Sequence, residues 1–134
     1  IIMDRDMYGN SKNKDEIVEV KVDIEKLDQY IKFKEKIKLI KIDTEGNEID
    51  VLLGMQQLLK YNPPSLIMIE DRGGVDRFQN KYKEYVNILN QYDYNIFYFT
   101  DAGLSGDKSK RVNMSDVLFV HRDYRKIKVK NSEN

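Results

Sequence analysis

The stretch that decides the fold runs from residue 37 to residue 70 and reads IKLIKIDTEGNEIDVLLGMQQLLKYNPPSLIMIE. Its first part, Ile37–Asp43, reads as a strand that ends on an acid, and its last part, Ser65–Glu70, as an apolar strand buried on both faces. Between them, apolar residues at helical spacing predict a helix that begins near Asn47 and is stopped by Asn62-Pro63-Pro64. Strand, helix and strand in this order predict a right-handed βαβ unit.

Polar residues at the start of this helix suit the positive end of a helix dipole. Asn47 is the predicted N-cap, and Asp50 follows three residues later. Glu48 is interpreted as a first-turn acid that interacts with the helix dipole. The predicted buried stripe comprises Ile49, Leu52, Leu53, Met55, Leu58 and Leu59.

The segments on either side extend the α/β pattern. The expected elements are a polar loop or hairpin at 1–15, a strand at 17–24, a short helix at 24–33, a helix at 81–90, and strands at 95–100 and 116–121. The polar connection between the last two strands has too few apolar residues to form a crossover helix. These two strands should therefore pair antiparallel.

Composition excludes several classes of protein. The chain has 134 residues, 40% of them hydrophobic, which indicates one domain over residues 1–125 followed by a charged tail at 126–134. Lys+Arg and Asp+Glu both number 23, so no basic field is available for nucleic acid or an anionic membrane. No apolar run approaches the roughly 20 residues of a membrane span. The lack of cysteine excludes disulfides and thiolate chemistry, and favours a cytoplasmic location.

Polar residues at the predicted strand ends are the candidate site, because ligands of open α/β sheets bind at the carboxyl ends of the strands. They are Asp43, Thr44, Glu45, Glu70, Asp71, Arg72 and the loop with Gly73-Gly74. Asp43, at the end of a buried strand, is favoured as functional. Glu45 could instead bond backbone amides, and Glu70 could form a surface ion pair with Arg72 or Arg77. Acids on adjacent strands can bind magnesium together, but such acids are common, and the sequence assigns no metal.

Three other features favour structural roles. His121 is the only histidine and follows the last strand, where a structural or exposed position outweighs a role as a base. The pair Gly103 and Gly106 lies in a loop between strands, so a turn is favoured over phosphate binding. Tyrosine and phenylalanine residues of the last helix and strands fall at core spacing. A hydrolase is disfavoured because no nucleophile elbow follows any strand.

The segment from Ile40 to Met55, IKIDTEGNEIDVLLGM, resembles the signature of the FkbM-type methyltransferases. That signature has the form Lys-x-Asp-x-Glu-Gly-x-Glu, followed by an apolar helix with Val-Leu-x-Gly. The segments Val20–Asp28 and Pro64–Glu70 are similar to the parts of that family that flank the signature. The resemblance is best over residues 18–75, and the remainder agrees in the order of its elements.

The resemblance implies the fold of class I methyltransferases. Their sheet has seven strands, mostly parallel, with one antiparallel strand in the terminal hairpin, and they use S-adenosylmethionine to methylate hydroxyl groups on sugars and other metabolites. The strands ending at Asp43 and Glu70 correspond to the fourth and fifth, and the last two to the sixth and seventh. We therefore expect the chain to be the C-terminal half of such a Rossmann-like domain. The N-terminal half would supply the cofactor-binding strands, so the chain alone should be inactive.

The resemblance also implies residue roles. Asp43, Glu45 and Glu70 are the candidate catalytic residues. Asp43 and Thr44 are placed at the cofactor, and Glu70 and Arg72 at a small-molecule or glycan substrate. The alternative is a catalytically inactive remnant or a protein-interaction module, because the strand ending at Asp43 would leave an apolar edge open to another chain.

Overall fold

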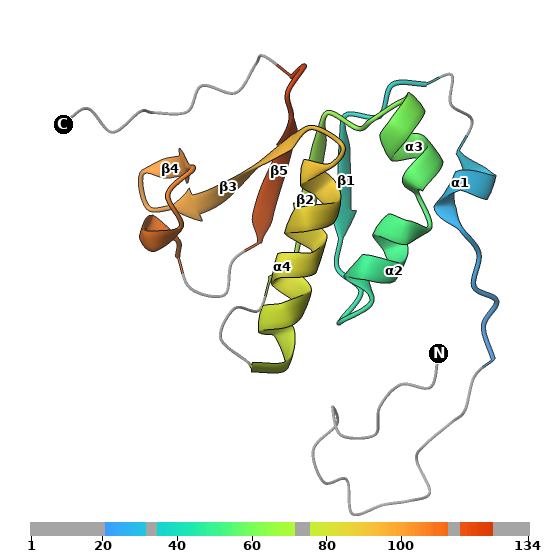
Figure 1. Cartoon of the computed structure of the whole chain (residues 1–134), viewed down its shortest axis with the longest axis horizontal. Coiled ribbons are helices and arrows are strands. Elements are labelled where there is room, and N and C mark those ends of the chain that lie inside the picture. The colour runs from blue at the N-terminus through green and yellow to red at the C-terminus, as the bar shows by residue number, and fades with distance from the viewer. Residues whose placement is uncertain (1–20, 32–34, 72–75, 113–115, 125–134) are drawn as a thin grey trace, which may run out of the picture.

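The computed structural model describes residues 21–31, 35–71, 76–112 and 116–124 (Figure 1). Its helices are α1 (Leu27–Tyr30), α2 (Glu48–Leu53), α3 (Gln56–Tyr61) and α4 (Asp76–Asn90). Its strands are β1 (Leu39–Ile42), β2 (Leu66–Ile69), β3 (Tyr94–Thr100), β4 (Gly103–Ser105) and β5 (Val117–His121), with a short 3-10 helix at Lys108–Lys110. No helix in these described ranges is long and apolar enough to cross a bilayer.

The strands form one mixed sheet of five, in the order β1-β2-β5-β3-β4. The pair β1 and β2 is parallel, as expected of strands on either side of a connecting helix. Strand β5 is antiparallel to both of its neighbours, β2 and β3. The predicted parallel pair and the predicted antiparallel pair are both confirmed. Within the described residues, β1 is an edge strand.

The hydrophobic core lies between the sheet and the helices α2, α3 and α4, and α4 lies in front of the sheet in Figure 1. Every residue of β5 is buried, because it lies in the middle of the sheet. Tyr85 of α4 packs edge-on against Phe119 of β5, with ring centroids 6.1 Å apart. Leu89, one helical turn further on, is also fully buried. The interpretation of these aromatic residues as packing groups is confirmed.

The prediction of a single helix from Asn47 to Asn62 is wrong, because α2 and α3 are separate helices. A side chain from another element caps the N-terminus of the second helix, α3. The carboxylate of Asp28, in α1, accepts hydrogen bonds from the backbone N–H groups of Gln57 and Leu58, at 2.9 and 3.0 Å. This N-cap comes from a residue distant in sequence, so local periodicity could not reveal it.

Gly54 is needed where α1 approaches the break between α2 and α3. Its carbonyl accepts a hydrogen bond from the backbone N–H of Asp28, at 3.1 Å. A Cβ at this position would lie 3.3 Å from the Asp50 carbonyl oxygen and 3.6 Å from the Cα of Lys26. The close approach of two backbones explains a glycine at the end of the Val-Leu-x-Gly pattern.

Other predictions need correction at the element ends. Residues 21–24 form no strand, and Val22 and Ile24 are exposed, while residues 17–20 lie outside the described ranges. The last helix begins at Asp76, well before the predicted residue 81, and the loop with Gly103 contains the short strand β4. Three further predictions fall outside the described residues: those for residues 1–15, for Arg72 with Gly73-Gly74, and for the tail at 126–134.

Candidate functional site

The C-terminal ends of the parallel strands β1 and β2 lie side by side at one end of the sheet. Ile42 pairs with Ile69, and the backbone N–H of Glu70 donates to the Ile42 carbonyl at 3.1 Å. Asp43 and Glu70 therefore leave adjacent strands side by side. One carboxylate oxygen from each of Asp43, Glu45 and Glu70 lies within 4.8 Å of the other two. The structure thus brings together the three acids that the sequence nominated as catalytic.

The turn after β1 has a left-handed backbone that orients Glu45. Glu45 has a φ of 55° and Gly46 a φ of 112°. A positive φ is uncommon for a residue other than glycine and persists only where neighbouring contacts hold it. Here Oε1 of Glu48 accepts hydrogen bonds from the N–H of Thr44 (3.3 Å), the Thr44 hydroxyl (3.3 Å) and the N–H of Gly46 (2.9 Å).

Glu48 therefore does more than interact with the helix dipole. It is buried, and it fixes the turn that carries Glu45. Asn47 was predicted to cap α2, but its side chain makes no capping hydrogen bond. Its Nδ2 donates instead to the Thr44 carbonyl, at 3.2 Å. The Thr44 hydroxyl, proposed for the cofactor, donates to Glu48.

Two lysines lie beside the acids. Nζ of Lys41 contacts Oδ2 of Asp43 at 3.0 Å, and this hydrogen bond is the main reason that the Lys41 pKa is raised, with Asp116 and Glu70 adding to the effect. Nζ of Lys81 donates to the Gly46 carbonyl at 2.6 Å. The sequence patterns assigned no role to either lysine or to Asp116. Alternation along β1 puts Lys41 and Asp43 on the same side of the strand, so that contact had a sequence signal.

Asp71, next to Glu70, has a structural partner. Its Oδ2 accepts from Nη1 of Arg111 at 2.5 Å, and its carbonyl accepts from Nη2 at 2.7 Å. The side chains of Asp71 and Arg111 are only 7% and 10% exposed, so the pair is shielded from solvent. Arg111 follows the 3-10 helix, and no local signal in the sequence linked it to Asp71.

A small pocket opens beside the acid cluster. It is lined by Glu45, Gly46, Glu48, Glu70, Asp71, Lys81 and Tyr85. Its volume is about 20 Å³, enough for about one water-sized group. Tyr85 is 3% exposed, and its hydroxyl makes no hydrogen bond of normal geometry with the described residues. Burial raises the pKa of Tyr85, and the charge and hydrogen bonding of Asp71 raise it further.

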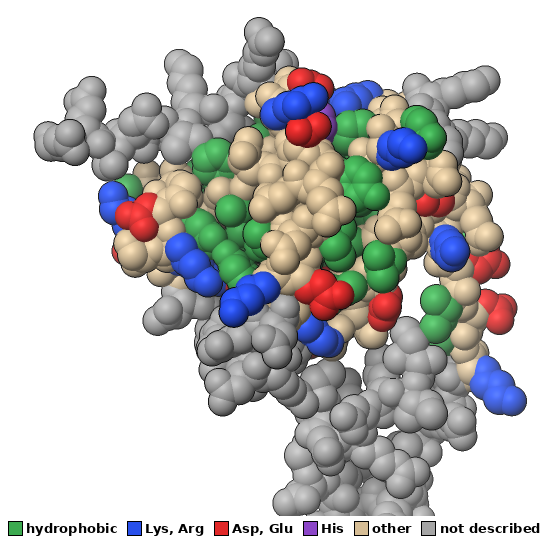
Figure 2. Space-filling view, viewed as in Figure 1, with side chains coloured by type: hydrophobic (Ala, Val, Ile, Leu, Met, Phe, Trp, Pro, Cys, Tyr) green, Lys and Arg blue, Asp and Glu red, His purple; other side chains and the backbone are tan. Residues whose placement is uncertain are grey.

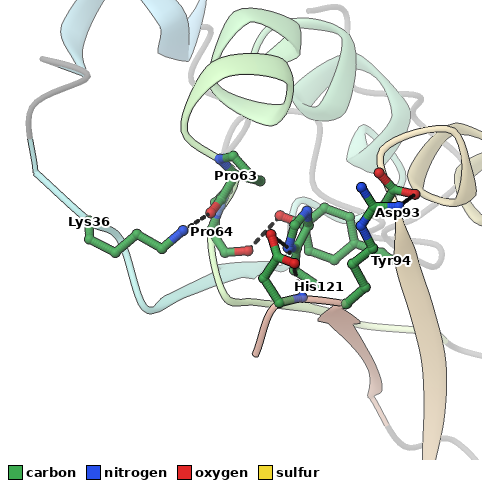
Figure 3. A network of polar contacts seen from close by, with 8 residues as sticks. Lys36, Pro63, Pro64, Asp93, Tyr94 and His121 are labelled. Atoms are coloured by element: carbon green, nitrogen blue, oxygen red, sulfur yellow. Dashed lines mark hydrogen bonds and ion pairs between the residues drawn. The ribbon is translucent and has the colours of Figure 1, made fainter. Parts of the chain in front are cut away.

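His121 lies at the opposite end of the strands, where the parallel strands β1 and β2 begin (Figure 3). This end of the sheet is called the amino edge, and the end that carries the acid cluster is called the carboxyl edge. Its ring is edge-on to Tyr94, with centroids 5.1 Å apart, and its Nδ1 accepts from the N–H of Asp123 at 3.3 Å. Burial lowers the pKa of His121, and the charge of Asp123 partly opposes that shift. These contacts support the structural interpretation, because the acid cluster is at the other end of the sheet.

Charges on the face shown in Figure 2 are mixed in sign. Acidic and basic side chains are scattered among apolar ones there. This pattern agrees with the zero net charge of the chain. Among the described residues, that face therefore offers no extended basic surface for a polyanion.

The fold and the site define a class: a mixed α/β domain, compatible with a methyltransferase, that gathers acids where parallel strands end. The family model for the methyltransferase FkbM domain matches residues 1–96. The chain therefore belongs to the FkbM methyltransferase family, as residues 40–55 indicated. The matched range contains Asp43, Glu45 and Glu70. No curated protein and no solved structure matched the chain.

Proposed function

We propose that the chain is the C-terminal part of an S-adenosylmethionine-dependent O-methyltransferase that acts on a hydroxyl group of a sugar or another small molecule. One observation carries the proposal: the FkbM match includes the three acids that cluster where β1 and β2 end. The family supports methyl transfer, and the strand-end position supports a ligand site. We further propose a cytoplasmic location, which the lack of cysteine supports.

The acid cluster suits the methionine half of the proposed donor. When bound, S-adenosylmethionine supplies a methyl group on a positively charged sulfur, and transfer forms a carbon–oxygen bond as the carbon–sulfur bond breaks. Carboxylates at Asp43 and Glu45 attract the positive charges of the sulfonium and amino groups. The N–H and hydroxyl of Thr44 both donate hydrogen bonds to Glu48. Thr44 therefore affects the binding of S-adenosylmethionine by shaping the turn.

The same acids can prepare the acceptor. Methyl transfer to a hydroxyl needs alignment of two reactants and a base for the hydroxyl proton. Asp43 or Glu45 takes this proton in our proposal, and Glu70 orients the acceptor from the neighbouring strand. Arg72, assigned to the substrate from the sequence, follows Asp71 directly in the chain but lies outside the described residues.

Among the described residues, no strand pairs with the outer side of β1, and this supports the proposal that the chain is a C-terminal part. Leu39 on this strand is 49% exposed, and a bare strand edge is a template for further pairing. Strands added here would extend the sheet as in a class I methyltransferase and would build the surface for the adenosine half of the donor. The same edge supports the second candidate, an inactive module that pairs with another protein.

The test is calorimetric titration of S-adenosylmethionine and S-adenosylhomocysteine into this chain, and into the complete gene product where that is longer. Binding by the longer protein alone would support a C-terminal part that needs further strands. Binding by this chain would support the methyltransferase and refute the need for them. Absence of binding by either would refute the cofactor proposal and favour the interaction module.

A further inference from the structure

The turn after β1 is held from two sides by side chains of two different helices. On its N–H side, Oε1 of Glu48 in α2 accepts hydrogen bonds from the backbone N–H groups of Thr44 and Gly46. On its carbonyl side, Nζ of Lys81 in α4 donates to the Gly46 oxygen at 2.6 Å. The conformation of residues 44–46 therefore depends on both helices.

The backbone of this turn needs such support. Glu45 has a φ of 55° and Gly46 a φ of 112°, and a residue other than glycine adopts a left-handed backbone only at some cost. A positive φ does not by itself indicate function, because Asp93 also has one, of 63°. Glu45 differs from Asp93 because its side chain lines the pocket at the carboxyl edge.

Both supporting side chains belong to the site that they support. Glu48 is 7% exposed, Lys81 is half-buried, and both line the same pocket as Glu45. Hydrogen bonds to or from a charged group are roughly twice as strong as those between neutral groups, and partial burial strengthens them further. A change in either side chain should therefore be felt directly at the Glu45 carboxylate.

We propose that Glu48 and Lys81 are positioning residues, which hold the turn after β1 in one conformation and thereby direct the Glu45 carboxylate to the ligand. Helix α4 then takes part in ligand binding through Lys81, although none of the acids nominated from the sequence belongs to it. The identity of the ligand, S-adenosylmethionine, rests on the proposed function. The hold of the two side chains on the turn does not.

The first test measures the turn itself and needs no ligand. In the isotope-labelled complete protein, amide hydrogen exchange should show the Gly46 N–H protected, because it is bonded to Glu48. Lys81→Met should lower this protection by about fivefold, the effect of about one hydrogen bond, even though Lys81 bonds the carbonyl and not the N–H. Lys81→Arg can still donate and should keep the protection. Glu48→Gln retains an acceptor oxygen and should keep more of it than Glu48→Ala.

The second test measures the binding of S-adenosylmethionine by calorimetry. Lys81→Met should weaken binding by about tenfold or more, because a small misplacement of a site residue can cost up to about 10²-fold. Removing a positive charge would by itself strengthen the binding of a positively charged donor, so a loss of affinity indicates a displaced turn. Lys81→Arg should restore the affinity, and the melting temperatures of both variants should stay close to that of the unaltered protein.

The matched control is Lys83→Met, which removes an exposed lysine from the same helix and should behave like the unaltered protein in both tests. Unchanged protection of Gly46 in Lys81→Met and Glu48→Ala would overturn the proposal. Reduced protection with unchanged donor affinity would overturn the positioning role and leave the proposed function standing. If the unaltered protein binds no methyl donor, the proposed function fails, whereas reduced protection in Lys81→Met still supports the hold on the turn.

Discussion

Two buried tyrosines lie at opposite ends of the sheet and differ in one respect. Tyr94 is 2% exposed and Tyr85 3%, and burial raises the pKa of both hydroxyls. The Tyr94 hydroxyl donates to the Pro64 carbonyl at 2.6 Å. The Tyr85 hydroxyl has no bond of normal geometry among the described residues, and the charge and hydrogen bonding of Asp71 act on it. A neutral carbonyl therefore satisfies the tyrosine at the amino edge, whereas the tyrosine at the carboxyl edge lies beside carboxylates.

Other contacts repeat this difference. At the amino edge, Lys36 donates to the Pro63 carbonyl at 2.8 Å and Arg122 pairs with Asp93 at 2.9 Å (Figure 3). At the carboxyl edge, three acids lie close together. A positive φ does not distinguish the two edges, because Glu45 has a φ of 55° at the carboxyl edge and Asp93 a φ of 63° at the amino edge. The clustered like charges, which repel one another, are particular to the carboxyl edge. The comparison separates a structural edge from a binding edge.

The largest expected effect is on activity. In the complete protein, Asp43→Ala should lower the rate of methyl transfer by at least about 10²-fold, because a positioned acid or base contributes about 10² to 10⁴. Its melting temperature should change little, since Asp43 is exposed. Steady-state kinetics measure the first effect and calorimetry the second. Asp123→Asn, at the other edge, should retain full activity, and retained activity in Asp43→Ala would refute the catalytic assignment.

The next largest effect is on stability, and it distinguishes two neighbouring acids at the carboxyl edge, Glu70 and Asp71. Asp71→Asn should lower the free energy of unfolding by about 3 kcal/mol, because it leaves the buried Arg111 guanidinium without its charged partner. Glu70→Gln should lower stability less, because Glu70 is half-buried and the substitution also relieves repulsion within the cluster. Urea unfolding of both variants makes the comparison. Equal losses in the two would show that Glu70 is as structural as Asp71.

A smaller effect compares the two tyrosines directly. Tyr94→Phe leaves the Pro64 carbonyl without its donor and should cost about 1 kcal/mol of stability. Tyr85→Phe removes a hydroxyl that makes no hydrogen bond of normal geometry with the described residues, so the free energy of unfolding should fall by less than in Tyr94→Phe. Both are measured by urea unfolding at neutral pH. A loss in Tyr85→Phe as large as that in Tyr94→Phe would mean that its hydroxyl is bonded, with Asp71 as the partner.

The smallest expected effect is the dependence of stability on pH that arises from His121 at the amino edge. Burial lowers the pKa of His121 from its usual 6.5, with Lys36 and Arg122 acting in the same direction and Asp123 and Asp93 against it. The unfolded chain therefore binds this proton more readily. The contribution of His121 to stability is complete above pH 6.5 and is lost as the pH falls through the lowered value. Stability should fall from pH 7 to pH 5, and less so in His121→Gln. Equal slopes would contradict this.

The sequence predicted the parts of the fold that local patterns encode. Ser65–Glu70 is continuously apolar, and the structure has a buried strand there that pairs parallel with β1. The position of the acids followed from the rule that ligands bind where parallel strands end. Their mutual distance did not, because it depends on the register of Ile42 with Ile69 and on the positive φ of Glu45.

Contacts between residues distant in sequence explain what local patterns missed. The break between α2 and α3 depends on the Asp28 carboxylate, which comes from a separate helix. Arg111 reaches Asp71 from a segment 40 residues further along the chain, and no local spacing connects them. The contact of Lys81 with Gly46 forms only when α4 packs against the turn after β1. Each of these contacts can be identified only in the folded chain.

The most direct test of a binding edge and a structural edge is two-dimensional NMR of the isotope-labelled complete protein during titration with S-adenosylhomocysteine, because a bound ligand shifts the signals of nearby amides. The account predicts that the amides of Glu45, Gly46 and Glu70 shift, while those of Tyr94, His121 and Asp123 do not. Shifts confined to the amides around Asp93 and Asp123, or no shifts at all, would contradict it.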